Sequence, residues 1–299
     1  MSRILVTGAA GFTGRYLGER LVGDGFDLHG LVNGECDRPI PGYSQLHEGD
    51  LTNAGSLREV IRSVRPTRVV HLAAVANVAH GDITEMYLVN VVGTRNLLDA
   101  LKQSGLDLSA VLLASSANIY GNSSVGVLGE GTPPRPANDY GVTKLSMEYV
   151  ASIYADFLPI IVTRPFNYTG SCQSTAFLVP KIIDHAKRRL PNIELGNLDV
   201  ARDFSDVRTI VDAYARLLDC RQAVGCTVNV CSGRSISIND IIGLVERESG
   251  HRMEVRVSNA LTRANEVRSL CGSKARLEDL IGPLEEIPFE ETVRWMLGA

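Results

Sequence analysis

Arg3-Ile-Leu-Val-Thr7, followed at once by Gly8-Ala-Ala-Gly11-Phe-Thr-Gly14, predicts a strand, a glycine-rich turn and a helix. In a turn of this kind one glycine permits the tight bend, one lets backbone N–H groups approach a pyrophosphate, and one lets the helix pack closely on the strand. The N-terminus of the helix then faces the anion. The spacing G-x-x-G-x-x-G directly after a first strand therefore predicts a dinucleotide site that includes Gly8, Gly11 and Gly14.

The residues after the second predicted strand, 27–32, bear on which dinucleotide the turn would hold. The position that follows this strand contacts the adenosine ribose, and an acidic residue there suits a 2'-hydroxyl. Here that position is Asn33, which neither repels a 2'-phosphate nor accepts two ribose hydroxyls well. Arg38 could serve a phosphate or be solvated, and Asp50 could cap the next helix or contact the adenine. The sequence therefore allows either NADPH or NADH.

Two further apolar runs, 69–74 and 110–116, predict buried strands of the same sheet. The first ends in Ala73 and Ala74 and the second in Ser116, so small and polar residues lie where a cofactor would cross the carboxyl ends of the strands. The alternation of strands and helices predicts an α/β fold with a doubly wound parallel sheet, the Rossmann arrangement.

Two residues near these strands are interpreted as structural. His71 lies inside an apolar run, and we expect a core histidine with a hydrogen-bond partner and no catalytic role. The helix that follows contains Asn90-Val-Val-Gly-Thr94. A glycine inside a helix costs about 1 kcal/mol relative to alanine, so Gly93 indicates close packing.

Tyr140-Gly-Val-Thr-Lys144 places a phenol and an ammonium on one face of a helix predicted over 139–156. At i, i+4 their Cβ atoms lie about 6 Å apart. A lysine held there favours the ionised phenol, and lowering a tyrosine pKa from about 10 towards 7 needs roughly 4 kcal/mol of differential stabilisation. Such a tyrosine can exchange a proton with a sugar hydroxyl or carbonyl near neutral pH.

Composition excludes several classes of protein. The 299 residues, 44% of them hydrophobic, can bury a large core, and a net charge of -4 without a long basic tract argues against nucleic acid or anionic lipid as a partner. No apolar run reaches the roughly 18 residues of a membrane span. The first strand begins at Arg3, which leaves no room for a signal peptide, so we expect a cytoplasmic protein. The six cysteines form no C-x-x-C pair, and we expect no metal site.

Besides the motif from Tyr140 to Lys144, the chain carries Ser116-Ala-Asn-Ile-Tyr120, Arg164-Pro-Phe-Asn167 and Arg202-Asp-Phe-Ser-Asp-Val207. With these motifs nearly the whole chain resembles the extended short-chain dehydrogenase/reductase family, which contains nucleotide-sugar epimerases, dehydratases and reductases. The resemblance implies a catalytic set of Ser116, Tyr140 and Lys144. The cofactor-binding residues that it implies are Gly8, Gly11, Phe12, Thr13, Gly14, Asn33, Arg38, Asp50, Leu51, Leu72, Ala73, Ala74, Asn90, Tyr140, Lys144 and Pro165.

The second half of the chain is similar to the GDP-mannose branch of that family. This similarity implies that Asn167, Arg202 and Arg263 surround the diphosphate of a sugar nucleotide, although both arginines could instead form surface ion pairs. Glu266 would be the acid of a C-terminal R-P-x-[DE] motif, in which Ala264 replaces the usual proline. The implied substrate-binding residues are Ser116, Asn118, Asn167, Val179, Arg202, Arg263 and Glu266.

Ala117-Asn118 distinguishes the possible reactions. Dehydratases that resemble this chain carry an acidic residue there to remove a proton beside the ketone, and neither Ala nor Asn can act as that base. Hydride transfer at C4 remains, in either a 4-keto reductase or a 4-epimerase. The resemblance to the GDP-mannose branch implies the former, NAD(P)H-dependent reduction of the C4 ketone of a nucleotide 4-keto-6-deoxyhexose, with GDP-4-keto-6-deoxy-D-mannose as the expected substrate. The alternatives are a 4-epimerase, a 4,6-dehydratase and, in a different class, a redox sensor that binds NADP without turnover.

The element pattern predicts two interleaved units and a paired assembly. Residues 1–165 and 203–231 would bind the dinucleotide, and residues 166–202 and 232–299 would form a smaller α/β lobe for the sugar nucleotide. The resemblance also implies a homodimer that pairs through the helices containing Asn90 and Tyr140.

Overall fold

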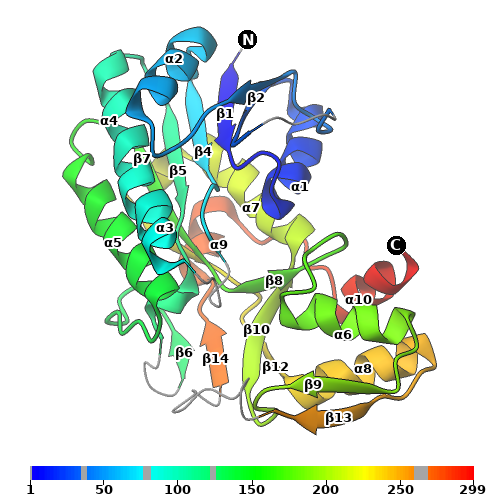
Figure 1. The fold of residues 1–299 in the computed structure, drawn as a ribbon. Helices are drawn as coiled ribbons and strands as arrows, with labels where there is room; N and C mark the ends of the chain where they lie inside the picture. Colours follow the sequence, from blue (N-terminus) through cyan, green and yellow to red (C-terminus); the bar gives the residue numbers. More distant parts are fainter. Residues whose placement is uncertain (1, 35–38, 77–81, 122–125, 259–268) are drawn as a thin grey trace.

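The computed structural model describes residues 2–34, 39–76, 82–121, 126–258 and 269–299, and its central element is a seven-stranded sheet (Figure 1). Its strand order is β11-β7-β5-β4-β1-β2-β3, and every neighbouring pair is parallel. The strands are β1 (Arg3–Thr7), β2 (Asp27–Val32), β3 (Gln45–Glu48), β4 (Arg68–His71), β5 (Ala110–Ala114), β7 (Ile160–Pro165) and β11 (Thr227–Val230). The predicted doubly wound parallel sheet is confirmed.

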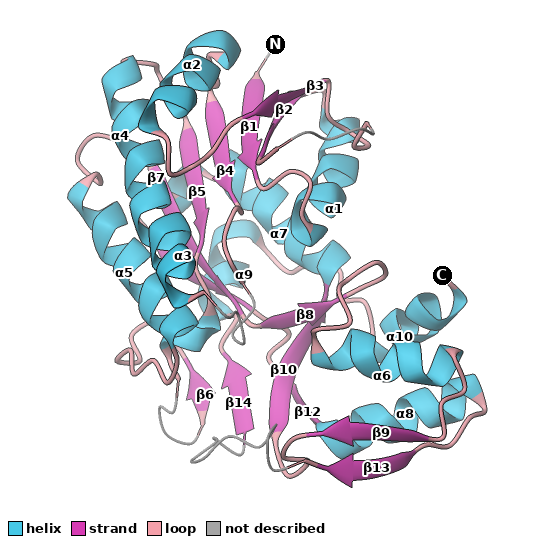
Figure 2. Cartoon of the chain, viewed as in Figure 1, coloured by secondary structure: helices cyan, strands magenta, loops and turns pink. Residues whose placement is uncertain are grey.

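Helices cover both faces of this sheet (Figure 2). On one face a core forms between the strands and α2 (Ala54–Val64), α4 (Thr94–Ser104) and α5 (Asp139–Ile153). On the other face the strands pack against α1 (Phe12–Leu21), α7 (Val207–Asp219) and α9 (Ala275–Ile281). Strands covered on both faces are apolar along nearly their whole length, which explains why β4 and β5 read as continuous apolar runs.

A second lobe lies beside the carboxyl ends of the main strands. In it β8 (Asn167–Thr169) and β10 (Ala201–Asp206) run parallel, and β10 also pairs with β12 (Ser235–Ser237) and β14 (Ser269–Gly272). The remaining strands are β6 (Val127–Leu128), β9 (Asn192–Leu195) and β13 (Glu254–Val257). Its own core is closed by α6 (Leu178–Lys187), α8 (Ile238–Ser249) and α10 (Phe289–Gly298).

The short helical segments complete the fold. They are η1 (Val22–Asp24), α3 (Ile83–Tyr87), η2 (Leu88–Gly93), η3 (Ala117–Ile119) and η4 (Arg221–Ala223). The segment η2 is a π-helical turn between α3 and α4. A Cβ added at Gly93 would lie 2.8 Å from the Cβ of Leu51, so the close packing predicted at this glycine is confirmed.

The helix that carries the Tyr-Lys motif differs from its prediction at the C-terminal end. It ends at Ile153, before the predicted 156. Met147 and Ala151 of the helix are buried against the sheet, whereas Ile153 and the nearby Phe157 are exposed. These two apolar side chains therefore face away from the core.

Candidate active site

The glycine-rich turn lies between β1 and α1, at the carboxyl edge of the sheet. Gly8 has φ +74°, a left-handed conformation that favours glycine, and its N–H donates to the carbonyl of Leu31. A Cβ at Gly14 would lie 2.3 Å from the carbonyl oxygen of Gly8. Gly11 precedes α1 and offers no side chain to cap it. The first amides of α1 therefore have no side-chain partner at the cap, and their contact with a pyrophosphate stays a prediction.

The adenosine side of the turn is partly described. Asn33 is exposed directly after β2. Asp50 accepts hydrogen bonds from the N–H and hydroxyl of Thr52, both at 2.8 Å. The cap of α2 is instead Asn53, so the capping alternative for Asp50 is wrong, and its contact with the adenine stays a prediction. Arg38 lies outside the described residues.

A chain of buried hydrogen bonds fixes the end of β4. The Thr94 hydroxyl donates to the carbonyl of Asn90, so its oxygen accepts from Nε2 of His71 at 2.9 Å. Nδ1 of His71 then accepts from Thr7 at 2.6 Å. Burial lowers the pKa of His71 to about 3, and the Lys144 charge contributes. His71 is thus a neutral core histidine, as predicted.

Asn90 is buried inside η2, and its amide is used within the protein. Its Oδ1 accepts from the N–H of Val75 at 2.8 Å, and its Nδ2 donates to the Thr143 hydroxyl at 3.1 Å. Thr143 donates in turn to the carbonyl of Tyr140. The Asn90 amide therefore holds the first turn of α5, and its contact with a cofactor stays a prediction.

The segment after β4 and two apolar residues complete the predicted cofactor set. Leu72, Ala73 and Ala74 are half-buried at the edge of the sheet, next to the turn. Gly8 packs there, because a Cβ on it would lie 2.8 Å from the N atom of Ala73. Leu51 and Pro165 are buried, so their side chains pack within the protein.

The structure brings together the predicted catalytic residues at the ends of β5 and α5. Ser116 is buried after β5, and its hydroxyl oxygen accepts from the N–H and the Nδ2 of Asn118, both at 3.1 Å. Lys144 is 3% exposed, and its Nζ donates to the carbonyl of Ala114 at 2.7 Å. This Nζ lies 5.9 Å from the centroid of the Tyr140 ring.

The electrostatics of Tyr140 correct the expectation drawn from its spacing. Burial raises the pKa of Tyr140, the neighbouring Tyr168 phenol acts in the same direction, and a hydrogen bond with Ser116 lowers it only in part. Lys144 has the carbonyl of Ala114 as its partner and not the phenol. The predicted lowering towards neutrality is therefore wrong for this arrangement. Tyr140 is protonated at neutral pH, which suits a proton donor.

Burial also lowers the pKa of Lys144 to about 8, although the charge of Glu148 opposes this effect. A lysine with such a pKa titrates within the range in which enzymes are assayed. The fraction of Lys144 in the ammonium form therefore depends on the charged groups around its side chain.

Sequence reasoning missed Tyr168, which lies beside the glycine-rich turn. Its hydroxyl is 2.8 Å from that of Thr13, and its ring stacks on Phe12 with centroids 6.2 Å apart. This contact links the turn to β8 in the second lobe. Only its position after Asn167 hinted at a role, because nothing in the local sequence shows that β8 approaches α1.

The predicted substrate residues fall into three groups. Asn167 is exposed on β8 and lies opposite Phe204 of β10. Arg202, two residues before Phe204 on β10, is half-buried. Val179 is buried in the core of the second lobe, so its side chain packs within the protein, and its contact with a substrate stays a prediction. Arg263 and Glu266 lie outside the described residues.

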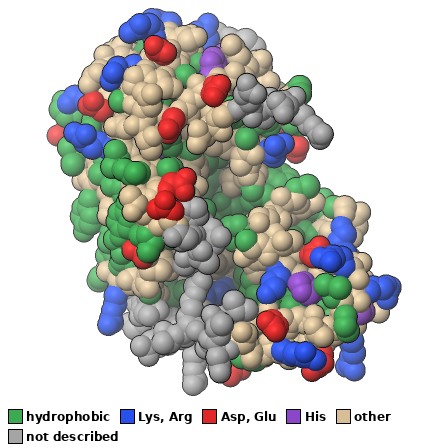
Figure 3. Space-filling model, in the orientation of Figure 1, with side chains coloured by type: hydrophobic (Ala, Val, Ile, Leu, Met, Phe, Trp, Pro, Cys, Tyr) green, Lys and Arg blue, Asp and Glu red, His purple; other side chains and the backbone are tan. Residues whose placement is uncertain are grey.

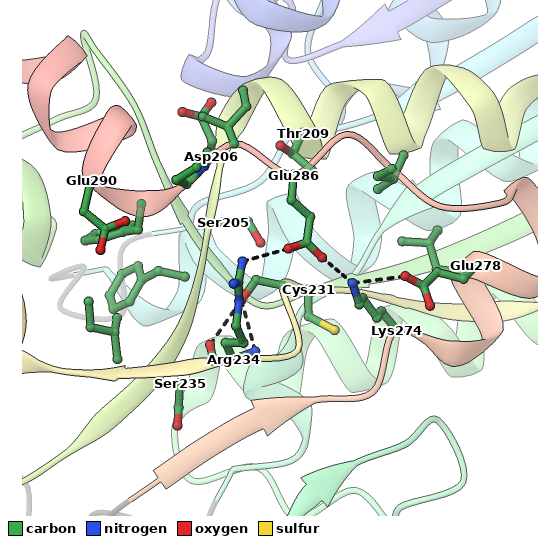
Figure 4. Close-up of a pocket in the computed structure, with 18 residues that line it drawn as sticks. Ser205, Asp206, Thr209, Cys231, Arg234, Ser235, Lys274, Glu278, Glu286 and Glu290 are labelled. Carbon is green, nitrogen blue, oxygen red and sulfur yellow. Dashed lines mark hydrogen bonds and ion pairs between the residues drawn. The ribbon is translucent and has the colours of Figure 1, made fainter.

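A separate cavity of about 310 Å³ lies on the other side of β10, between α7, α9 and the segment before α10 (Figure 4). Arg234 and Lys274 both pair with Glu286 at its wall. Among the described residues, none of the predicted site residues lines it, so it is separate from Ser116, Tyr140 and Lys144.

Two features of the described residues bear on other functions. No group of three or more His, Cys, Asp or Glu side chains in them is arranged to hold a metal ion. None of their helices is long and apolar enough to cross a membrane. The cytoplasmic location stays a prediction.

Comparison with known proteins places these residues in context. A family model described as GDP-mannose 4,6 dehydratase matches residues 5–296. GDP-6-deoxy-D-talose 4-dehydrogenase of Aggregatibacter actinomycetemcomitans is 33% identical over 94% of this chain and 91% of its own length. GDP-6-deoxy-D-mannose reductase of Pseudomonas aeruginosa is 32% identical over 99% of this chain and 96% of its own.

Two solved structures are similar over nearly their whole length. One, from Burkholderia cenocepacia J2315 and described as a candidate epimerase, is 48% identical over 99% of this chain and 97% of that chain, with a TM-score of 0.92. The other, RMD from Pseudomonas aeruginosa complexed with NADPH, is 31% identical over 100% of this chain and 98% of that chain, with a TM-score of 0.85.

Proposed function

This chain belongs to the GDP-mannose 4,6-dehydratase family, and from that membership we propose that it reduces the C4 ketone of a GDP-linked 4-keto-6-deoxyhexose, using NADPH or NADH. The best candidate substrate is GDP-4-keto-6-deoxy-D-mannose. Relatives named for a 6-deoxy-D-mannose reductase and a 6-deoxy-D-talose 4-dehydrogenase support this substrate class. We further propose that the domain built on the seven-stranded sheet binds the cofactor and that the second lobe binds the sugar nucleotide.

The observation that carries the proposal is the hydrogen bonding of Ser116. Both N–H groups of Asn118 donate to its hydroxyl oxygen, which has two lone pairs. The Ser116 proton therefore points away from Asn118 and towards the Tyr140 hydroxyl, and we expect it to turn to the C4 oxygen when the sugar binds. Asn118 occupies the place of a dehydratase base and acts as a donor, which supports a reductase and argues against loss of water from the sugar.

The protein's own part in the reaction is to supply a proton and stabilise charge. The protonated Tyr140 phenol donates to the alkoxide that forms at C4, while Ser116 donates a hydrogen bond to the same oxygen. The Lys144 ammonium stabilises the phenolate that Tyr140 becomes. Asn90 and Thr143 hold the turn that carries Tyr140, so the phenol is fixed before the substrate arrives.

The glycine-rich turn fits a dinucleotide. Backbone atoms leave no room for a Cβ at Gly8 or Gly14, and the N-terminus of α1 is free of a side-chain cap. The bound nicotinamide would supply the hydride to C4. Gly8, Gly11 and Gly14 would hold its pyrophosphate, and Lys144 would also contact the nicotinamide ribose. Asn33, in place of an acid, favours a site that exchanges its cofactor and accepts NADPH at least as well as NADH.

Reduction of the keto sugar tests the proposal. The purified protein is incubated with GDP-4-keto-6-deoxy-D-mannose and NADPH, and NADPH absorbance is followed together with the sugar product. We expect one NADPH consumed per keto sugar and little NAD bound to the purified protein. UDP- and dTDP-linked 4-keto-6-deoxy sugars serve as matched controls for the nucleotide. No oxidation of NADPH with any of these substrates would refute the proposal.

A 4-epimerase is the second candidate, because the structure that is 48% identical is described as a candidate epimerase. An epimerase must take hydride from C4 and return it to the other face, so it keeps its cofactor through each turnover. Conversion of a non-keto GDP-hexose to its C4 epimer without added cofactor would therefore favour this candidate over the reductase.

We also propose that the protein is a homodimer that pairs through α3, η2 and α5, which contact one another. Ile83, Leu88 and Val92 are 51%, 45% and 41% exposed, and Tyr149 and Ile153 on α5 are 66% and 70% exposed. Figure 3 shows hydrophobic side chains gathered over this side of the molecule. Such an apolar face suits a second copy of itself across a two-fold axis.

The mass in solution tests the dimer. Light scattering should give twice the chain mass for the natural protein and a single chain mass for Ile153→Arg. Val257→Arg, at a residue that is 58% exposed in the second lobe, is the matched control and should stay dimeric. A monomeric natural protein would exclude the proposed pairing.

A further inference from the structure

Glu148 lies one helical turn after Lys144 on α5, and it is nearly as well buried as the lysine. Its carboxylate is 11% exposed and makes a two-point ion pair with Arg164 of β7, with Nε to Oε1 at 3.0 Å and Nη2 to Oε2 at 2.7 Å. Oε1 also accepts from the Ser115 hydroxyl at 2.5 Å. The carboxylate therefore joins α5 to the carboxyl ends of two neighbouring strands.

We propose that Glu148 is a positioning residue for the catalytic set: its carboxylate keeps the Lys144 side chain in the ammonium form and, through Ser115, fixes the end of β5 that presents Ser116. This inference rests on the proposed function, because the charge of Lys144 matters to catalysis only if Tyr140 transfers a proton.

The electrostatic part of the proposal follows from the groups that surround Lys144. Burial disfavours its ammonium form, and Glu148 is the group whose charge favours it. His71 on β4 is neutral above pH 3 and Tyr140 is protonated, so neither supplies a negative charge near neutral pH. Two charges at i, i+4 interact strongly where the dielectric constant is low, and α5 presents both to the protein interior.

Arg164 has two opposing effects. Its ion pair keeps Glu148 charged although the carboxylate is buried, and burial of such a charge without a partner would be costly. Its own positive charge acts against the ammonium of Lys144. Arg164 is held in place by the Tyr120 hydroxyl at 2.9 Å and the carbonyl of Glu130 at 3.0 Å. Removing Glu148 alone therefore exposes Lys144 to an unbalanced cation.

The geometric part concerns Ser116. Ser115 and Ser116 follow β5 directly, and the N–H of Ser115 donates to the carbonyl of Thr163 on β7. The bond from the Ser115 hydroxyl to Glu148 ties the same residue to α5, which carries Tyr140. One carboxylate thus sets both the charge of the lysine and the spacing between serine and tyrosine.

The direct test is the titration of Lys144 in Glu148→Gln, measured by NMR of protein with ¹³C-labelled lysine, without any substrate. The missing signal in Lys144→Met assigns the resonance. From the natural value of about 8, we expect the pKa to fall by about one unit, which is the usual size of a nearby-charge effect. An unchanged value in Glu148→Gln would overturn the electrostatic proposal, whatever the activity.

The pH profile of kcat tests the same point in turnover. With a pKa one unit lower, the charged fraction of Lys144 at pH 8 falls from about a half to about a tenth, so kcat at pH 8 should fall about fivefold more than kcat at pH 6. Glu148→Asp, which keeps the charge, should restore the natural profile. Ser115→Ala removes only the hydrogen bond, so it should lower kcat equally at all pH values.

Two further variants separate the outcomes. Glu278→Gln breaks another i, i+4 Lys-Glu pair, with Lys274 at 3.0 Å, far from the catalytic set, and should leave the profile unchanged. If Glu148→Gln does not fold, Glu148→Gln with Arg164→Met removes both charges of the pair and should give a smaller pKa shift in the same direction. A natural protein without reductase activity refutes the proposed function, whereas the NMR titration decides the role of Glu148 independently.

Discussion

The buried His71 makes a quantitative prediction about stability in acid. In the fold the imidazole is neutral, bonded to Thr7 and Thr94, and its pKa is lowered by burial from 6.5 to about 3. In the unfolded chain the ring titrates at about 6.5. Between these two values the unfolded state binds one more proton than the folded state. Stability from this group is therefore fully present above pH 6.5 and is lost as the pH falls towards 3.

The size of the effect follows from the two pKa values. A difference of 3.5 units corresponds to about 5 kcal/mol in all, of which about 4 kcal/mol is lost when the pH has fallen to 3. Over a range that is easier to measure, pH 7.5 to pH 5, the loss is about 2 kcal/mol. Other groups also titrate there, so the prediction concerns the difference between the natural protein and His71→Gln, whose amide carries no charge.

Urea unfolding at each pH provides the measurement. His71→Gln should be less stable at pH 7.5, because it disturbs a buried site, but its stability should fall by about 2 kcal/mol less on going to pH 5. His185→Gln, on the partly exposed surface of α6, is the matched control and should follow the natural curve. Equal pH dependence in His71→Gln and the natural protein would refute the buried neutral histidine.

Three predictions concern the site itself. Tyr140→Phe should lower kcat by about 10² to 10⁴ with NADPH binding largely intact, and a loss below tenfold in steady-state assays would remove Tyr140 as the proton donor. Arg202→Ala should remove a charge-assisted bond worth about 1.5 to 3 kcal/mol and raise KM for the sugar nucleotide, while an equal loss of NADPH affinity would assign the arginine to the fold. Gly14→Ala should unfold at lower temperature and lose NADPH binding in a fluorescence titration, because the added Cβ would lie 2.3 Å from a backbone oxygen. In the control Gly23→Ala the added Cβ meets nothing within 4 Å, so this variant should bind NADPH as the natural protein does.

Local spacing was enough to predict the sheet, the turn and the shared helix face of Tyr140 and Lys144, whereas the catalytic roles of Ser116, Tyr140 and Lys144 came from the family resemblance and stay a prediction. Apolar runs separated by helical patterns predict parallel strands. The glycines of the turn between β1 and α1 indicate close backbone packing, because a Cβ at Gly8 or Gly14 would clash. Tyr140 and Lys144 lie on one helix, so their proximity is a property of the helix alone. Contacts between residues a few positions apart on one helix follow from the helical repeat, so the sequence alone predicts them.

Burial and contacts between distant segments were decided by the tertiary structure. The pKa of Tyr140 rises because the folded chain surrounds the phenol, and the side chain of Val179 is buried because α6 turns it into the core of the second lobe. Glu148 meets Arg164 only because α5 packs across β5 and β7. Helical periodicity predicts which residues share a face of the helix. How deeply that face is buried, and which charged groups it packs against, depend on elements far away in the sequence. The spacing could therefore identify the Tyr-Lys pair, while only the packed fold shows which groups set its charge.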